Sequence, residues 1–248
     1  MTTETPVHLL LSATGGTGSA LARRLAARGG CQLALAGRSA DATEGLAREV
    51  GGTAHTWSEA TFDETERVVA DVLSRHGRLD GLVCCSGSLI LKPAHRTSEE
   101  EWRETCAANL DAAFAAVRAG AGAMQKSKGG SIVLMASAAA RIGFANHEAI
   151  AAAKAGVIGL GLSAAATYAP RGVRVNVVAP GLVDTPLAEP ITSREAALDA
   201  SAKMHAMGRI GRPEEVASAI EWLLSPEQGW VTGQVLGVDG GLGSLRGR

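Results

Sequence analysis

Short apolar runs recur along the chain, and a stretch with the spacing of an amphipathic helix follows nearly all of them. Strands are predicted at 7–11, 31–36, 53–57, 79–85, 132–136, 173–178 and 234–238. Helices are predicted at 19–28, 41–50, 63–76, 98–124, 147–168 and 213–224, with a break in the fourth near Asn109. Strands that alternate with helices pair in parallel, and right-handed crossovers place helices on both faces of the sheet. The pattern therefore predicts a doubly wound α/β fold.

The stretch from 180 to 207 has the weakest periodicity, and its second half, from 191, is expected to be irregular or helical. It follows the carboxyl end of a predicted strand, which is where ligands bind in open α/β sheets. We therefore expect this stretch to form a lid over a binding site.

The composition is that of one globular domain spanning 1–248. A chain of 248 residues with 46% hydrophobic and 20% charged residues can bury a large core. Its formal net charge of −1 leaves no basic surplus for nucleic acid, and no apolar run reaches the roughly 18 residues needed to cross a bilayer. The chain start lacks a signal-peptide pattern, and four cysteines without a Cys-x-x-Cys pair suit a reducing compartment. We expect a cytoplasmic protein with a small-molecule substrate.

A glycine-rich turn joins the first predicted strand to the first predicted helix. It carries glycine at positions 15, 16 and 18. Glycine lets the backbone approach a pyrophosphate closely, and the start of a helix favours negative charge. The turn indicates a dinucleotide site, although a tight strand-to-helix turn without a ligand would read the same way.

Arg38 follows the end of the second predicted strand. In dinucleotide-binding folds an acidic residue at this tip binds the ribose 2′-hydroxyl, whereas an arginine accommodates a 2′-phosphate. The tip reads Gly37-Arg38-Ser39, and the first carboxylate is Asp41. NADP is therefore expected, with NAD as the alternative, unless Arg38 is an ordinary solvated arginine.

Several further short motifs occur in a fixed order along the chain. They are Gly16-x-Gly18, Gly77 to Asp80, Asn109-Leu110, Ser137, Ala151 to Gly156 around Lys154, Pro170 to Asn176, Pro180-Gly181, Val231 to Gly233 and Asp239 to Gly241. This series resembles the short-chain dehydrogenase/reductase family over nearly the whole chain. The resemblance implies a seven-stranded Rossmann sheet, a nicotinamide cofactor, oxidoreductase activity and a homotetramer or homodimer.

The resemblance also implies roles for individual residues. Lys154 would bind the nicotinamide ribose hydroxyls, Asn109 would anchor a water in a proton relay, and Ser137 would hydrogen-bond the substrate carbonyl. The expected cofactor contacts are Ser12, Thr14, Gly15, Gly16, Thr17, Gly18, Arg38, Gly87, Asn109, Lys154, Pro180, Gly181, Val183 and Thr185. The serine could instead only cap a turn, the asparagine only stabilise a helix kink, and the lysine only be solvated.

Three places depart from the family pattern. Ser12 stands where the first glycine of the turn is usual, so a serine must adopt that backbone conformation. The usual Asn-Asn-Ala-Gly after the fourth strand is Cys-Cys-Ser-Gly at 84–87. Ile150 stands four residues before Lys154, where the family carries its catalytic tyrosine. Reduction of a carbonyl needs an acid to protonate the oxygen, and isoleucine cannot supply that proton.

His147 is the ionisable residue that best compensates for Ile150. Tyr168, the only tyrosine, lies fourteen residues after Lys154 and thus roughly 20 Å along the helix. His147 lies seven residues before Lys154, on the same predicted helix face, and imidazole titrates near neutrality. Enoyl reductases of this superfamily carry their tyrosine at that spacing, which implies a conjugated carbonyl substrate. A water held by Asn109 and Lys154 is the alternative donor, and His147 could also have no chemical role.

Two other functions remain open. A nucleotide-binding protein without dehydrogenase activity, acting as a sensor or assembly partner, is favoured by Ile150, Ser12 and the two adjacent cysteines. A lyase or isomerase could use the same cavity without net redox change. No metal is expected, because no second histidine or carboxylate has ligand spacing to His147.

Overall fold

The computed structural model describes residues 5–245, and within them seven parallel strands form one sheet. The strand order is β3-β2-β1-β4-β5-β6-β7. The strands are β1 (Val7–Leu11), β2 (Gln32–Gly37), β3 (Thr53–Thr56), β4 (Gly81–Cys84), β5 (Gly130–Met135), β6 (Val173–Pro180) and β7 (Val235–Val238). The chain builds outward from β1 in one direction and then in the other, so a switch point lies between β1 and β4. The doubly wound parallel fold is confirmed.

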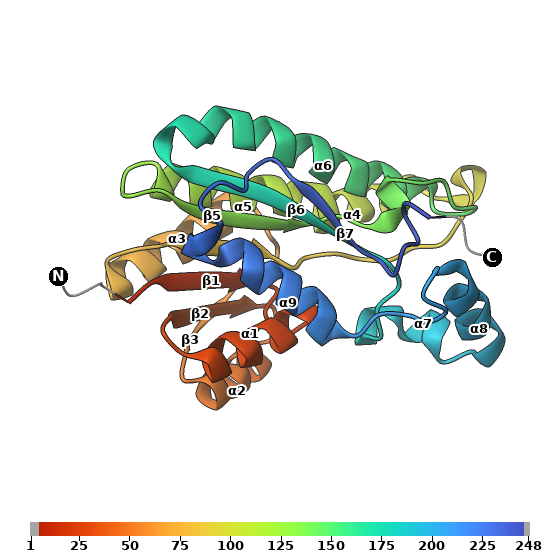
Figure 1. Ribbon diagram of the computed structural model, residues 1–248, viewed down its shortest axis with the longest axis horizontal. Helices are drawn as coiled ribbons and strands as arrows, with labels where there is room; N and C mark the ends of the chain where they lie inside the picture. Colours follow the sequence, from red (N-terminus) through yellow and green to blue (C-terminus); the bar gives the residue numbers. More distant parts are fainter. Residues whose placement is uncertain (1–4, 246–248) are drawn as a thin grey trace.

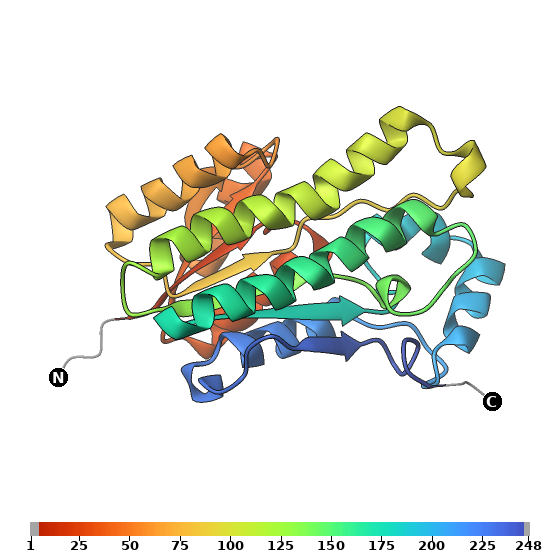
Figure 2. The ribbon, with the colours of Figure 1, turned by 90° about the horizontal axis from the view of Figure 1, so that it is seen from above.

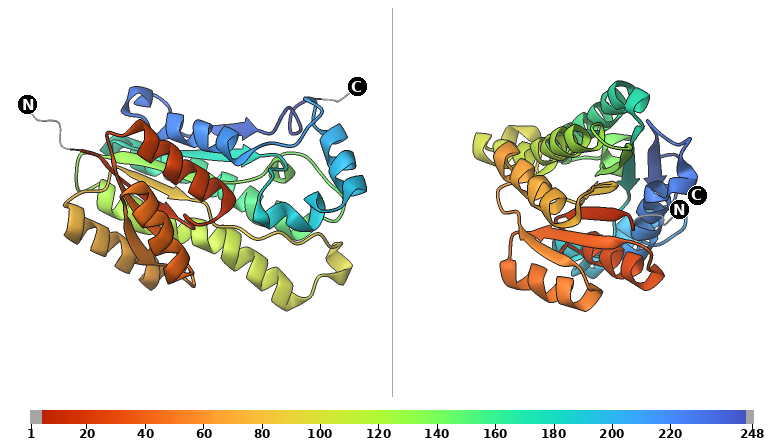
Figure 3. Two further views of the ribbon diagram at one scale, coloured as in Figure 1. Left: turned by 90° about the horizontal axis from the view of Figure 1, so that it is seen from below. Right: turned by 90° about the vertical axis from the view of Figure 1, so that its left-hand side faces the viewer.

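Helices cover both faces of this sheet (Figures 1 and 3). One face packs against α1 (Gly16–Arg28), α2 (Ala40–Val50) and α9 (Pro213–Leu224). The other packs against α3 (Phe62–His76), α5 (Ala112–Met124) and α6 (Glu148–Tyr168), and α4 (Glu99–Cys106) precedes α5. Figure 2 shows α3, α5 and α6 side by side over the strands.

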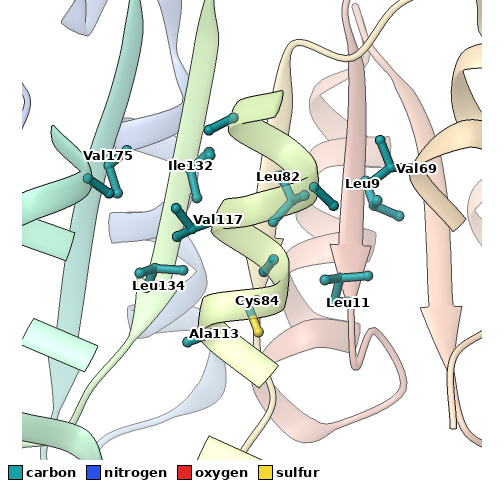
Figure 4. Close-up of a cluster of buried hydrophobic side chains, with 14 of the residues drawn as sticks. Leu9, Leu11, Val69, Leu82, Cys84, Ala113, Val117, Ile132, Leu134 and Val175 are labelled. Carbon is teal, nitrogen blue, oxygen red and sulfur yellow. The ribbon is translucent and has the colours of Figure 1, made fainter. Parts of the chain in front are cut away.

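The core consists of two hydrophobic layers, one on each face of the sheet. Alternate strand residues point to opposite faces, so Leu9 and Leu11 join one layer and Leu10 the other. Figure 4 shows the first layer, where Val117 of α5 lies over Ile132 and the neighbouring strands. Burial on both faces explains why the strands read as continuous apolar runs.

Helix α6 is apolar on all sides, and it begins one residue later than predicted. Residues Glu148–Arg171 are long and apolar enough to cross a membrane by length and composition, yet nearly half of the most apolar window is buried in the structure. A core helix of an α/β sheet meets the same criterion, and α6 packs on β6 and β5. The helix begins at Glu148, one residue later than predicted, and ends at Tyr168.

The predicted break near Asn109 is present and is a π-helical turn. Residues Ala107–Asp111 form this turn between α4 and α5. The wider turn leaves a local irregularity in the helical hydrogen bonding, a feature frequent at functional sites. Asn109 is 1% exposed within it, so its side chain points inward.

The weakly periodic stretch after β6 contains two short helices, α7 (Glu189–Thr192) and α8 (Glu195–Met204). They lie beyond the carboxyl ends of the strands in Figure 1. Residues 191–207 were predicted to be irregular or helical, and both kinds of structure occur there. The position suits the expected lid.

Candidate active site

The glycine-rich turn adopts a left-handed conformation at Ser12, whose φ is +56°. An L-residue pays about 1–2 kcal/mol for that region, which is why glycine is usual there. The Ser12 carbonyl accepts a hydrogen bond from the N–H of Gly15 at 3.2 Å. An ideal Cβ on Gly18 would lie only 2.6 Å from the same oxygen. The turn therefore keeps its tight shape despite the serine, and Gly18 is needed for it.

The start of α1 is open to an anion. The helix begins at Gly16, three residues earlier than predicted, because the glycines of the turn continue into its first turn. Gly15 caps it without a side-chain hydrogen bond, and its first turn has no acidic residue. Thr14 and Gly15 are exposed. Unpaired N–H groups at such a helix start attract phosphate.

The loop after β6 lies against this turn. An ideal Cβ on Gly16 would be 2.6 Å from Cγ2 of Thr185, so the two segments are in close contact. Pro180 ends β6, and the N–H of Gly181 donates to Val238 O at 3.2 Å. Val183 is nearly buried and pairs with Gly211 in a short parallel bridge. Gly16 and Thr185, both predicted for the cofactor, are therefore in contact although they are distant in the chain.

Lys154 is the most buried cation among the predicted site residues, with 6% of its surface exposed. Its Nζ donates to Met135 O at 2.8 Å and to Ser86 O at 3.3 Å. Burial lowers the pKa of Lys154 to about 8, and the thiols of Cys84 and Cys85 act weakly in the opposite direction. Burial disfavours a charged amine, so this lysine can lose its proton near neutral pH.

Asn109 lies next to Lys154 across a glycine. Its Nδ2 donates to Ser88 Oγ at 3.0 Å and to Thr105 O at 2.8 Å, and its Oδ1 accepts from the N–H of Ser88 at 3.3 Å. An ideal Cβ on Gly87 would lie 3.1 Å from that Oδ1 and 3.3 Å from the lysine Nζ. A Cβ at position 87 would therefore crowd both the amide and the ammonium.

Ser137 follows β5 two residues after Met135, whose carbonyl holds Lys154. It caps a short 3₁₀ turn, and its Oγ accepts a hydrogen bond from the N–H of Ala139 at 3.2 Å. The hydroxyl hydrogen stays available for another acceptor. Ser137 can therefore cap the turn and at the same time donate a hydrogen bond to a substrate carbonyl.

Ile150 lies within α6, whereas His147 lies just before the helix begins. Ile150 is on α6, one turn before Lys154, and only 4% exposed. His147 precedes the helix; its Nδ1 lies 2.8 Å from Ala145 O and its ring lies 5.4 Å from the ring of Phe144. The Nδ1–H donates to that carbonyl, so Nε2 of the neutral ring carries a lone pair and no proton. None of the described hydrogen bonds joins His147 to Ser137, Asn109 or Lys154.

Arg38 is exposed at the carboxyl end of β2. The next residue, Ser39, caps α2 with its Oγ on the N–H of Ala42 at 3.3 Å. Asp41 is in the first turn of that helix. The guanidinium therefore meets solvent at the place where a 2′-phosphate would lie in a dinucleotide-binding fold.

Sequence reasoning missed the serines on either side of Gly87. Ser86 Oγ donates to Ala108 O at 2.9 Å, and Ser88 exchanges two hydrogen bonds with Asn109. The signal available in the sequence was a pair of hydroxyls flanking a glycine directly after a buried strand. Within residues 5–245, no group of three or more His, Cys, Asp or Glu side chains is placed to hold a metal ion.

Comparisons with known proteins agree with this arrangement. Residues 12–243 match the family model described as Enoyl-(Acyl carrier protein) reductase. The chain is 35% identical over 249 residues to 3-oxoacyl-(acyl-carrier-protein) reductase FabG of Thermotoga maritima, covering 98% of this chain and 99% of the relative. It is 34% identical over 230 residues to a protein of Xanthobacter autotrophicus named inactive 2-(S)-hydroxypropyl-CoM dehydrogenase 2, covering 90% of this chain and 99% of that one.

A solved structure is similar over the full length. The short-chain type dehydrogenase/reductase from Mycobacterium ulcerans superposes with a TM-score of 0.92 at 32% identity, covering 100% of this chain and 93% of that chain. The seven-stranded parallel sheet agrees with this likeness. This chain therefore belongs to the short-chain dehydrogenase/reductase family of oxidoreductases.

Proposed function

We propose that this protein is an NADP(H)-dependent oxidoreductase that acts on a small carbonyl or conjugated carbonyl compound and uses an altered proton donor. The observation that supports this most is the burial of Lys154 beside Asn109 and Gly87, at the strand end that also carries Ser137. Ionisable groups with strongly perturbed pKa values concentrate in functional sites.

The residues around the glycine-rich turn fit a dinucleotide. The uncapped start of α1 offers N–H groups to the diphosphate, and Gly15, which is exposed, has only the Ser12 carbonyl oxygen near its Cβ position. Bound NADPH would supply the hydride. Lys154 binds the nicotinamide ribose, Ser137 polarises the substrate oxygen, and the segment from Pro180 to Thr185 lines the nicotinamide side.

The proton must come from a group other than the side chain at 150. Our two candidates are His147 and a water held by Asn109 and Lys154. Because the Nδ1–H of His147 donates to Ala145 O, the imidazole could give a proton from Nε2 only in its charged form. A histidine donor therefore requires an imidazolium, whereas the lysine is close to its own transition at neutral pH.

Preference for NADPH is expected to depend on Arg38. Replacement of Arg38 with alanine should weaken NADPH binding by roughly 10- to 100-fold, the loss expected for a hydrogen-bonded charge on a phosphate. NADH binding should change little, because NADH lacks the 2′-phosphate. Titration followed by nicotinamide fluorescence measures both affinities. Arg48→Ala, on the exposed side of α2, is the matched control, and equal losses for both cofactors would contradict the assignment.

The function itself is tested in two steps. Failure to bind either NADPH or NADH would sink the proposal. A panel of ketones, aldehydes and enones should then be run with NADPH on the wild type and on His147→Ala. If the imidazolium is the donor, His147→Ala should lower turnover by about 10²-fold or more. Unchanged turnover would remove His147 and favour the water and Lys154.

A second candidate is a nucleotide-binding protein without dehydrogenase activity. The observation that favours it is Ile150, buried where the family resemblance places the catalytic tyrosine. One relative, the protein of Xanthobacter autotrophicus, is itself named inactive. Binding of NADPH together with no turnover across the panel would support this reading.

We further expect a cytoplasmic homotetramer or homodimer. Trp230, just before β7, is 99% exposed, and Trp222 on α9 is also exposed. Contiguous apolar patches on a surface commonly mark contacts between subunits, and these two tryptophans are the side chains from which we expect such a patch to be built. The mass in solution, measured by light scattering, tests this expectation.

A further inference from the structure

The ammonium of Lys154 has one hydrogen that its backbone partners leave free. Two of its three hydrogens point to Met135 O and Ser86 O. An ideal Cβ on Gly87 would lie 3.3 Å from Nζ, so bare backbone borders the ammonium there. A group that entered beside Gly87 could therefore accept the third hydrogen.

The side chains nearest to Lys154 do not compete for this role. Ile150, one turn earlier on α6, is apolar, and Asn109 does not ionise. The ionisable groups that act on the pKa of Lys154 are the thiols of Cys84, which ends β4, and of Cys85, the next residue. Burial raises the pKa of both thiols, that of Cys85 to about 12, so both are neutral near pH 8.

Two carboxylates on neighbouring elements are exposed to solvent, whereas the ammonium is buried. Asp111 on the π-helical turn and Glu148 at the start of α6 are both exposed. Within residues 5–245, the ionisable groups that act on the pKa of Lys154 are the two thiols, which carry no charge near pH 8. The ammonium therefore has no counter-ion, and its burial is what moves its ionisation toward neutral pH.

We propose that Lys154 is itself the acid that protonates the substrate oxygen, and that Ser86 is the residue that positions its ammonium. The proposal rests on the oxidoreductase function proposed above and names the donor for it. It gives Lys154 a second role in addition to ribose binding, because Ile150 stands where the family carries its catalytic tyrosine.

Ser86 positions the lysine through its own backbone. Its carbonyl accepts from Nζ, while its Oγ donates to Ala108 O in the π-helical turn at 2.9 Å. Ser88 ties the same loop to Asn109 through two more hydrogen bonds. The loop from 86 to 88 is thus fixed on both sides of Gly87, and the acceptor of the ammonium is held in place.

The proton transfer balances without any further reactant. The carbonyl carbon gains a hydride as NADPH becomes NADP⁺, and the π-electron pair of the C=O bond moves to oxygen. That oxygen takes a proton from Nζ, and the electrons of the broken N–H bond stay on nitrogen. The neutral amine of Lys154 then regains a proton from solvent.

The ionisation of Lys154 can be observed without any activity. The chain has five lysines, so protein labelled with ¹³C-lysine gives few side-chain signals, and Lys154→Met identifies the one of interest. We expect its signal to titrate near pH 8 in the protein with and without NADPH. A signal that stays in the charged form up to pH 10 would overturn the proposal.

The rate of reduction should follow the same transition. The acid must be protonated, so kcat should fall about tenfold per pH unit above pH 8. Ser86→Ala frees the carbonyl that stabilises the ammonium, so the NMR transition and the limb of the pH–rate profile should both move down by about half a pH unit. Ser127→Ala is the matched control, because the Ser127 Oγ likewise donates to a backbone carbonyl, Met124 O, at 3.0 Å. It should shift neither the NMR transition nor the pH–rate limb.

Each result separates the possible failures. No NADPH binding refutes the oxidoreductase function itself. Turnover whose rate does not fall through the Lys154 transition refutes the lysine acid and leaves that function standing. Bound NADPH without turnover also refutes the acid role. If Ser86→Ala lowers stability and rate but leaves the pH limb in place, the positioning role of Ser86 is wrong.

Discussion

Replacing Ile150 with tyrosine is expected to raise ketone reduction, because a phenol replaces the lysine as the acid; the upper bound is the gain of about 10²- to 10⁴-fold that a general acid contributes where no other acid acts. Ile150 lies one turn before Lys154 on the same buried face of α6, so a phenol there would lie near the ammonium. A nearby positive charge lowers the pKa of a phenol and makes it a better donor. Initial rates of NADPH oxidation with a ketone measure the gain.

The matched control is Ile150→Phe, which adds the ring without the hydroxyl. Both variants enlarge a buried side chain, which typically costs about 1–3 kcal/mol of stability. Thermal unfolding of the two proteins should therefore shift together, while only the tyrosine variant should gain activity. An equal rate for both variants would mean that the cavity does not bring carbonyl and cofactor together.

Acid is expected to destabilise the fold through His8, by about 3 kcal/mol between neutral pH and pH 4. His8 on β1 is 8% exposed, and its Nδ1 has no hydrogen-bond partner. Burial lowers its pKa to about 4, against the weaker opposing charge of Asp80. The unfolded chain takes up this proton near pH 6.5, so the free energy of unfolding falls as pH drops from about 6.5 to 4.

Denaturant unfolding of His8→Leu isolates this effect, because leucine keeps the bulk and cannot ionise. His55, whose pKa is also lowered by burial, is present in both proteins, so its contribution cancels in the comparison. Position 81 is left as glycine in both proteins, since an ideal Cβ there would lie 2.3 Å from the His8 Nδ1. Parallel stability curves for wild type and variant between pH 7 and 4 would show that His8 is not responsible.

Much of the fold could be predicted because its signals are periodic. A strand buried on both faces reads as an apolar run, and Ser137 was placed just after the end of such a run, whereas Asn109 was placed at a break in a predicted helix. The break at Asn109 was also visible, but its π-helical form was not. The hydropathy pattern shows which face of a helix is buried, but it does not distinguish the hydrogen-bond pattern of a π-helical turn from that of an α-helix.

The polar contacts of the site could not be predicted. Ser86 bonds a carbonyl 22 positions along the chain, and no periodicity encodes such a pair. His147 was expected inside α6, where it would share a face with Lys154. It lies instead before the helix, with φ −110° and ψ 13°, because its Nδ1 binds the backbone at Ala145. A local hydrogen bond from the side chain to the backbone thus competes with helix formation at the start of α6.

The place of Tyr168 has an optical consequence. It is the only tyrosine in the chain, and it terminates α6 at the end away from Lys154. Phenolate absorbs in the near ultraviolet, apart from the neutral phenol, so a single distant tyrosine gives a low and simple background. The ionisation of a phenol introduced at 150 would then appear directly as a change in absorbance. The Ile150→Tyr variant therefore allows the effect of Lys154 on the pKa of a neighbouring phenol to be measured by absorbance.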